Sequence, residues 1–500
     1  MIGTVSGYSS TMMVQTLQKN RDDLQDAMRQ IGTGRASTTY GGLGNDRGLA
    51  LDLRHEISQI DMFKSNIEQM QTRIKVMDDS LKRINGIGTE VRESARTTEY
   101  NMTSENKSMA QISSTTLMKE MLGLLDTEIN GRHLFAGKNT DKAPTLDYDQ
   151  IMYGHNGQQG LIDVTNERIA ADKGTDGLGR LALTNTAANV SLDEAATVFG
   201  LKLNSVSNGL TGASVTGPTG DPATLDVDFA SKPNANQELV LTFDLPGGGK
   251  HSITLKASDN PTELGDGYFQ VGTDPNGNAA SLKTELEAQL KKVVTAEGEA
   301  ASRVAAALDF FSTGNGGEPK RVVGSPPETA TTLDTATVAG KPTVNWYVGD
   351  NGTDSARGTA KAQIDTNLEV EYGVRANEKG FARQLAYIAA YSIPEYTTDG
   401  SVDKNRYKAM TSAVAGGLSI NQQQQTVQTI QSELAITNKM GTQTNDRHKV
   451  TENMMKTMSD GIEGINKEEV AVKVMNLQNR MQMTYQTTSI LFNLSLSKYI

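Results

Sequence analysis

The most regular feature of the chain is a row of apolar residues between positions 53 and 91. Its members recur at alternating intervals of three and four positions: Ile60, Phe63, Ile67, Met70, Ile74, Met77, Leu81, Ile84 and, after a glycine patch, Val91. This spacing places an apolar seam along one side of an α-helix and favours a second helix against it. Charged residues such as Lys64 and Asp78 fall on the other side. We therefore predict a long helix over residues 49–96 that packs as a coiled coil rather than in an ordinary globular bundle.

The same spacing appears nearer the N-terminus. In residues 9–31 it is carried by Met13, Leu17, Leu24, Ala27 and Ile31, with the polar Asn20 in the same row. It predicts a helix that ends at the glycines 32 and 34. The glycine-rich stretch that follows, up to Arg47, lacks both GxxxxGK[ST] and a preceding strand, so we interpret it as a connector and not as a phosphate-binding loop. A third helix is expected over residues 104–128.

The composition changes near Asn130, and from there to about Asp365 the chain is rich in Gly, Thr, Asp, Asn and Ala. Alternating apolar and polar residues predict strands over 239–245, 252–256 and 268–271, of which the first two form a hairpin around Pro246. Helices are expected over 279–294 and 301–311. A short helix over 191–199 is also expected, with Ser191 as its cap and Glu194 completing a capping box. Residues 324–344 are expected to form a loop.

Helical spacing returns after Asp365. A helix is predicted over 378–391, and a long one from 401 to at least 440, with Val427, Ile430 and Leu434 on its seam. The run Gln422–Gln425 is interpreted as a polar face inside this helix. The seam is expected to continue through Val450 and Met454. The last helix repeats the spacing at Val470, Val474, Leu477 and Met481, and Thr484 and Thr488 continue it weakly.

These elements predict a mainly α core of long antiparallel coiled-coil helices from both chain ends, with inserted α+β outer domain(s). Seams at both ends that nothing else in the chain can cover indicate that the monomer is incomplete, and repeated head-to-tail contacts give an open filament. The expected divisions are an N-terminal assembly helix and connector (1–48), the N-terminal half of the helical core (49–142), the inserted region (143–364), the C-terminal half of the core (365–445) and a C-terminal assembly helix (446–500). The assembly seam is assigned, as a hypothesis, to Leu17, Leu24, Ile31, Ile60, Ile67, Ile74, Leu81, Val470, Val474, Leu477 and Met481.

Composition narrows the classes of partner. The net charge of −11 argues against nucleic acid as the main partner, because phosphate binding needs a basic face. The absence of cysteine excludes disulfides and cysteine-ligated metals. No run approaches the roughly 18 apolar residues of a membrane helix, so membrane insertion is not expected. The first residues show no basic segment followed by an apolar one, so no classical signal peptide is expected.

The sequence offers no convincing catalytic, cofactor or metal site. Its five histidines have no ligand spacing, and neither HExxH nor GxSxG is present. We interpret Gly154–Gly157 as a turn. The single tryptophan, Trp346, could be a carbohydrate platform, but buried packing is the favoured interpretation. Methionines of the terminal seams, Met13, Met28, Met70, Met77, Met454 and Met481, could allow small sliding between subunits, although ordinary core packing is slightly favoured.

Four segments together resemble the bacterial flagellin family. Ile31–Arg35 stands in the place of the family's L-S-S-G-x-R/K, and Asn130–Asp141 is similar to G-x-Y-L-F-x-G-x-x-T-D. Tyr372–Glu378 resembles a segment where related chains re-enter the core, and Tyr485–Ser489 with Leu494–Leu496 resembles the family's tail. The resemblance covers about residues 1–142 and 365–500. The chain departs from the family pattern in Asn45-Asp46, where Asp-Asp is common, and in Gly32-Thr33-Gly34, where Ser-Ser-Gly is common.

The resemblance implies a structural subunit of the bacterial flagellum that self-assembles through its terminal helices into an extracellular helical filament for swimming. The terminal segments would be disordered in the monomer and pair on assembly. Implied partners are further copies of the chain, hook-associated and cap proteins, a cytosolic export chaperone at the C-terminal helix, and the flagellar type III export apparatus, which needs no cleaved signal peptide. The segment Leu134–Asp141 is also typical of the flagellin-like hook–filament junction protein, which is the first alternative. A coiled-coil surface adhesin is the second, and an enzyme is not expected.

Overall fold

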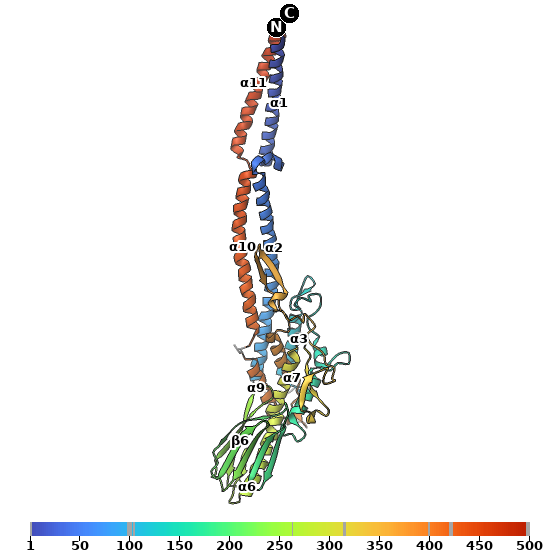
Figure 1. The fold of residues 1–500 in the computed structure, drawn as a ribbon, viewed down its shortest axis with the longest axis vertical. Helices are drawn as coiled ribbons and strands as arrows, with labels where there is room; N and C mark the ends of the chain where they lie inside the picture. Colours follow the sequence, from blue (N-terminus) through green and yellow to red (C-terminus); the bar gives the residue numbers. More distant parts are fainter. Residues whose placement is uncertain are drawn as a thin grey trace. The chain divides into compact units, whose positions relative to one another are not determined.

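The computed structural model describes residues 3–97, 103, 106–262, 264–313, 317–398, 401–419 and 424–496 (Figure 1). The chain divides into two compact units. Unit 1 combines the residues up to Met70 with Ala362–Val370 and the residues from Lys439 on, and unit 2 combines Gln71–Lys361 with Glu371–Asn438. Two helices, α2 (Arg47–Arg96) and α10 (Val427–Glu463), contribute residues to both units.

Unit 1 is built from paired helices. Helix α1 (Gly3–Thr33) lies antiparallel beside α11 (Lys467–Leu496) (Figure 1). The short 3₁₀ helix η1 (Tyr40–Asp46) leads into α2, and part of the hairpin of β13 (Lys361–Asp365) and β14 (Leu368–Glu371) also belongs to this unit. The pairing of helices from the two chain ends confirms the antiparallel arrangement expected from the seams.

The helical part of unit 2 packs around α8 (Lys379–Ser392). Helix α3 (Met109–Leu125) begins with a capping box between Ser108 and Gln111 and packs on α8, which also contacts α7 (Glu299–Phe311) and α9 (Lys404–Gly417). Helices α4 (Tyr148–Tyr153) and α5 (Leu161–Lys173) and the π-helical segment η2 (Val294–Gly298) complete the helical part. Short hairpins join β1 (Glu128–Ile129) to β2 (Arg132–His133), β11 (Lys320–Val323) to β12 (Thr332–Thr335) and β15 (Thr397–Thr398) to β16 (Ser401–Val402). Two further 3₁₀ turns are η3 (Pro327–Thr329) and η4 (Arg357–Thr359).

The strand-rich part of unit 2 contains two four-stranded sheets. One has the order β3 (Leu181–Thr186), β4 (Asn189–Glu194), β7 (Ala223–Phe229), β6 (Ala213–Gly220), and the other β10 (Tyr268–Gln270), β9 (Lys250–Ser258), β8 (Glu238–Asp244), β5 (Lys202–Asn208). Helix α6 (Pro275–Val293) contacts strands of both sheets (Figure 1). Alternate residues such as Val190, Leu239 and Leu241 are buried with Leu282 and Leu286 of α6 in one cluster. The β8–β9 hairpin around Pro246 confirms the sequence prediction.

Two predictions for the inserted region are wrong. Residues 191–199 do not form a helix, because Ser191 and Glu194 belong to strand β4, where Ser191 pairs with Asp226. The alternation of the buried residues Val190 and Leu192 outweighs the capping-box pattern. The expected loop at 324–344 contains the strand β12.

The helix expected from 401 to 440 is broken. Helix α9 ends at Gly417 and α10 begins at Val427. Gln424 and Gln425 therefore lie between two helices, while Gln422 and Gln423 fall outside the described residues. A Cβ on Gly417 would lie 2.0 Å from the ring of Tyr387, so the chain approaches α8 closely where α9 ends. Gln425 donates from its Nε2 to Glu378 at 2.8 Å and does not lie on a polar helix face.

Candidate functional site

Helices α1 and α11 pair through the positions that the sequence singled out. In α1, Asn20 and Ala27 are buried and Met13, Leu17 and Leu24 are half-buried; in α11, Leu477 is buried and Val470, Val474, Met481, Thr484 and Thr488 are half-buried. Ile31 is 37% exposed and contributes least to the pairing. These residues cover one another within the chain, so their part in contacts between copies stays a prediction.

The seam of α2 is also turned inward. Ile60 and Ile67 are buried in unit 1, and Ile74 and Leu81 are buried in unit 2. Burial in the single chain means that these four side chains act first as core. Their assignment to an assembly seam remains a hypothesis, and any surface for contacts between copies has to be sought on other faces.

The seam of α10 becomes polar in unit 1. Thr444, His448 and Glu452 are buried, whereas Val450 and Met454 are 66% and 62% exposed, so the predicted continuation through those two residues is wrong. The seven-residue repeat that begins at Leu434 continues at Gly441 and His448, so the positions of the buried seam follow from the sequence spacing. The apolar pattern does not reveal this part of the seam, because polar side chains occupy several of its positions.

The polar seam of α10 is held by specific contacts. The ring of His448 stacks on Phe63 with 5.7 Å between centroids, and its Nε2 lies 2.7 Å from the carbonyl oxygen of Ile364. Glu452 accepts a hydrogen bond from Lys64 Nζ at 2.7 Å and also pairs with Lys456. The hydrogen bonds from Lys456 and Lys64 hold the pKa of Glu452 below its usual value. Such paired charges define the register of a helix pair more narrowly than apolar contacts do.

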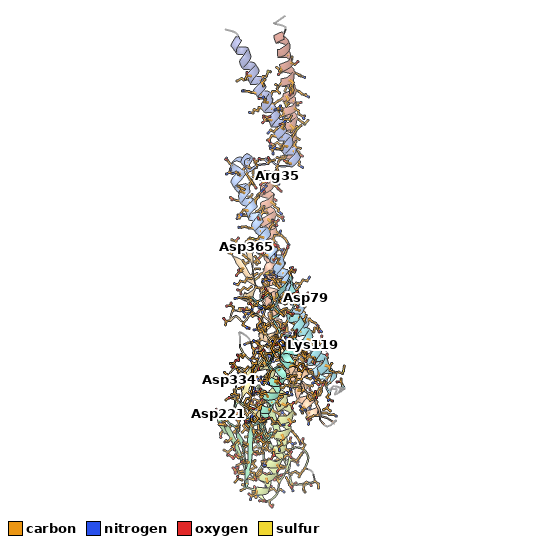
Figure 2. All side chains as sticks on the ribbon, turned by 90° about the vertical axis from the view of Figure 1, so that its right-hand side faces the viewer. Arg35, Asp79, Lys119, Asp221, Asp334 and Asp365 are labelled. Atoms are coloured by element: carbon orange, nitrogen blue, oxygen red, sulfur yellow. The ribbon has the colours of Figure 1, made fainter. Side chains whose placement is uncertain are left out.

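A connector joins the two helix pairs of unit 1. Gly34, at φ +70°, follows the end of α1, and the N–H of Ala36 donates to the carbonyl of Glu463 at 2.8 Å. Arg54 donates from Nε to Glu463 at 2.8 Å and from Nη1 to Tyr40 Oη at 2.8 Å. Arg35, labelled in Figure 2, forms a β-bridge with Gly464 beside these contacts of the connector. The glycine-rich stretch is thus a folded connector tied to the C-terminal half of the chain.

The outward faces of unit 1 carry many large apolar side chains. Those of α1, α2, α10 and α11 that are exposed, here called the outer apolar surface, are Met12, Val14, Met28, Ile31, Leu49, Leu51, Met62, Met440, Val450, Met454, Met458, Val472, Met475, Met483, Tyr485 and Ile490. Met28 and Met454, which the sequence placed on the seams, belong to it. Exposed apolar surface of this extent marks a site of interaction with another protein.

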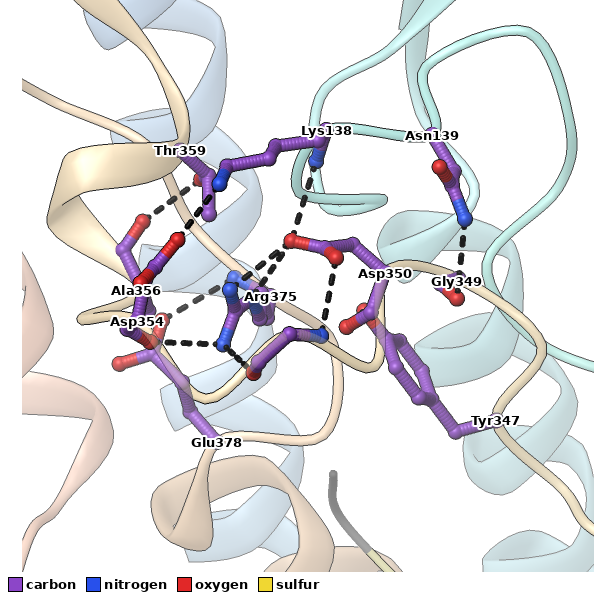
Figure 3. Close-up of polar contacts among 11 residues, drawn as sticks. Lys138, Asn139, Tyr347, Gly349, Asp350, Asp354, Ala356, Thr359, Arg375 and Glu378 are labelled. Atoms are coloured by element: carbon purple, nitrogen blue, oxygen red, sulfur yellow. Dashed lines mark hydrogen bonds and ion pairs between the residues drawn. The ribbon is translucent and has the colours of Figure 1, made fainter. Parts of the chain in front are cut away.

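In unit 2, two segments singled out in the sequence lie side by side. Ala136 forms a β-bridge with Arg375, and the N–H of Ala376 donates to the carbonyl of Phe135 at 2.8 Å. Arg375 is buried and donates from Nη2 and Nε to one carboxylate oxygen of Asp350 (Figure 3). Its Nη1 donates to the carbonyls of Gly352 and Asp354 at 2.8 and 2.9 Å. The guanidinium therefore ties Arg375 to the stretch 350–354, and the backbone of residues 375–376 ties it to residues 135–136.

The electrostatics of this cluster follow from its burial. Burial alone would raise the pKa of Asp350, but the hydrogen bond from the Gly352 N–H and the charge of Arg375 hold that pKa below its usual value. Burial raises the pKa of Glu378 in spite of the nearby charge of Arg357. Gly137, at φ +66°, leaves room for Asp350, since a Cβ there would lie 2.7 Å from the Asp350 Cβ. The cluster braces the fold, and sequence reasoning missed it because its members are far apart in the chain.

The remaining candidates have structural surroundings. Trp346 is buried, and its Nε1 donates to the carbonyl of Phe311 at 3.1 Å. This burial confirms the interpretation as a packed core residue and not as a carbohydrate platform. His155 pairs with Gln158 across the predicted turn. Within the described ranges no group of three metal-ligating side chains is found, and the expected lack of metal or cofactor stays a prediction. Among the helices described, none is both long and apolar enough to cross a membrane.

Comparison with known proteins adds one match. Residues 6–140 fit the family described as the bacterial flagellin N-terminal helical region. The matched segment contains α1 from residue 6 on, the connector, α2, α3 and the hairpin before Phe135. A comparison with curated protein sequences found no match.

Proposed function

From the match over residues 6–140, which supports membership of the bacterial flagellin family, we propose that the chain is the self-assembling subunit of a flagellar filament. The family is one of structural proteins and implies an extracellular place in the flagellum. The observation that carries the filament role is the outer apolar surface of unit 1. It lies on helices from both chain ends, and an apolar surface that is repeated on every copy can serve the head-to-tail contacts of an open filament.

The arrangement of side chains supports assembly through this surface. On α11, Leu477 and Met481 face α1, so Val472, Met475 and Met483 are left on the outward side. A pair of helices can bury only one stripe of each helix. The apolar residues beyond that stripe gain cover when a second pair packs against the first, and burying each one fully contributes about 1.5–3 kcal/mol.

The other parts of the chain follow from this role. Unit 2, with its two sheets, would face solvent, and the divisions at residues 48, 142, 364 and 445 would separate assembly helices, core and outer region. The subunit would leave the cell through the flagellar type III export apparatus without a cleaved signal peptide. A cytosolic chaperone would cover α11 until export, and hook-associated and cap proteins would meet the ends of the filament.

Seeded growth tests the proposal. Purified chain is added to short filament fragments, and elongation is followed by electron microscopy. The double variant Met475→Asp/Met483→Asp should fail to elongate, because the two charges that each copy would bury in its contact with the next cannot be solvated. Val338→Asp, at an exposed position of unit 2, is the matched control and should elongate normally. Normal elongation of the double variant would contradict a role for this face.

A second candidate is the flagellin-like hook–filament junction protein. The observation that favours it is the segment Leu134–Asp141, which resembles that protein and here anchors the Arg375 cluster. A junction subunit would not elongate seeds at all and would be scarce in sheared extracellular protein. A deletion strain that keeps its hooks but sheds its filaments would then support the junction role.

A further inference from the structure

Half of the outer apolar surface consists of methionine. Its members include Met12, Met28, Met62, Met440, Met454, Met458, Met475 and Met483, which are between 38% and 67% exposed and are here called the eight outer methionines. Among the exposed large apolar side chains described in unit 2, only Met109 is a methionine, and the others are tyrosine, valine, leucine or isoleucine. Exposed methionine is therefore concentrated on the surface that we propose for contacts between copies.

The outer methionines of the C-terminal helices lie in stripes. Met454 and Met458 are four residues apart in α10. In α11, Met475, Met483 and Ile490 follow one another at intervals of eight and seven. Residues at these intervals share one side of a helix. A copy that packs along either stripe therefore covers more than one thioether at once.

The other methionines that the structure describes in the two units are mostly shielded from solvent. Met13, Met455 and Met481 are half-buried. The core methionines are at most 2% exposed, and they are Met70, Met77, Met118, Met121, Met152 and Met410. Because oxidation of a sulfur side chain depends on its exposure, an oxidant in solution reaches the eight outer methionines before the core ones.

Methionine is the only sulfur-containing side chain of this protein. The chain has no cysteine, whose thiolate would otherwise be the sulfur group that a peroxide attacks most readily. The single tryptophan, Trp346, is fully buried. The first reaction of the folded chain with a mild oxidant therefore falls on exposed methionine, and so on the outer apolar surface.

Oxidation changes these side chains from apolar to polar. One oxygen of hydrogen peroxide bonds to the methionine Sδ as the O–O bond breaks, and the other oxygen leaves as water. The thioether is oxidised to a sulfoxide and the peroxide is reduced. The new oxygen accepts hydrogen bonds, so its burial against apolar neighbours without a donor is unfavourable.

We propose that the eight outer methionines are a reversible oxidation site that controls assembly. A peroxide converts them to sulfoxides in the free chain, and the oxidised surface then packs poorly against another copy. Methionine sulfoxide reductases, one for each epimer, restore the thioether, while two thiols are oxidised to a disulfide and the oxygen leaves as water. In the filament the same side chains are covered. This inference rests on the filament role proposed above.

Seeded growth from peroxide-treated chain tests the site. The full-length chain is treated until mass spectrometry finds the eight outer methionines oxidised and the core methionines intact. The critical concentration for elongation from untreated filament fragments is then measured. Because sulfoxides are buried without donors at each contact, it should rise at least about tenfold above that of untreated chain. Treatment with both reductases and dithiothreitol should return it to the untreated value.

A leucine variant separates this site from general oxidative damage. Replacement of the eight outer methionines by leucine keeps the surface apolar and changes side-chain volume little. This variant should elongate equally well before and after peroxide treatment. Met109→Leu, at the exposed position of unit 2, is the matched control and should remain as sensitive to peroxide as wild type.

The untreated wild-type chain reports separately on the filament role. If it does not elongate the fragments, the filament role fails and this inference fails with it. If it elongates and the oxidised chain has the same critical concentration, the filament role stands and the oxidation site is overturned. Loss of growth that the reductases do not reverse, or that the leucine variant shares after peroxide treatment, would also overturn the oxidation site. If the leucine variant fails to grow before treatment, recovery of the oxidised wild type by the reductases decides.

Discussion

The two units of the chain place their apolar side chains in opposite ways. Unit 2 has more than twice as many residues as unit 1, yet most of the exposed large apolar side chains belong to unit 1. Unit 2 packs sheets and helices against several neighbours, and Trp346, Phe310 and Phe381 are fully buried there. Unit 1 pairs its helices, and one partner covers only one stripe. The difference indicates that unit 2 is complete within one chain and unit 1 is not.

The largest effect on the stability of unit 2 is expected when the Arg375 side chain is removed from its buried cluster. Arg375→Ala leaves Asp350 buried without its partner and should destabilise unit 2 by about 3–5 kcal/mol. Urea unfolding measures the loss. Lys138→Ala, which removes an exposed partner of Asp354, is the control and should cost at most about 1 kcal/mol. Equal effects of the two variants would show that the cluster does not brace the fold.

A smaller loss is expected at Gly137. Gly137→Ala adds a Cβ that meets Asp350 at 2.7 Å in a backbone conformation of positive φ, and should cost about 2–4 kcal/mol. Gly131→Ala has a similar φ of +74° with nothing within 4 Å, so it should cost only about 1 kcal/mol. Chemical denaturation of both variants gives the difference. If Gly131→Ala is as damaging as Gly137→Ala, close packing against Asp350 is not the cause.

The seams of α1, α2 and α11 could be predicted from the sequence because apolar residues such as Leu17, Ile67 and Leu477 occupy them at helical spacing. The seam of α10 in unit 1 could not, because His448 and Glu452 are polar and satisfy their polar groups only through partners on other segments.

The Arg375 cluster could not be predicted from the sequence for a different reason. Asp350 and Arg375 are 25 residues apart and meet the segment at Gly137 only in the folded chain. Ser191 and Glu194 show the reverse case, in which a helix-start pattern occurs within a strand. The alternation of buried residues, and not this local motif, determines that the segment forms a strand.

The pH should affect the two units in different ranges. The pKa of Glu378 in unit 2 is raised above 4.5, so the stability that it contributes is complete below pH 4.5 and is lost as the pH rises through the raised value. The pKa of Glu452 in unit 1 is lowered, so its contribution is present above pH 4.5 and is lost as the pH falls through the lowered value.

Hydrogen exchange separates these two contributions. Each should change the local exchange rate by up to about tenfold per unit of pKa difference. Glu378→Gln should abolish the trend above pH 4.5 near α8, and Glu452→Gln the trend below pH 4.5 near α10. Trends that persist in the Gln variants would assign the pH dependence to other groups.

Only a small change in stability is expected from methionine replacements in the seams. Met77→Leu with Met481→Leu should alter stability by less than about 1.5 kcal/mol, since the two side chains have similar volume. If these methionines allow sliding between copies, the double variant should form filaments of altered waveform and swim differently. Unchanged waveform and motility would show that the two residues have only a packing role in the core.

The central claim is that copies of the chain meet through the outer apolar surface of unit 1. Methionine oxidation read by mass spectrometry tests it most directly, with purified monomer and grown filament treated by the same dose of peroxide. Met454, Met475 and Met483 should be oxidised in the monomer and protected in the filament, while Met109, 63% exposed in unit 2, should react in both. Equal oxidation of the three unit 1 methionines in monomer and filament would contradict the account.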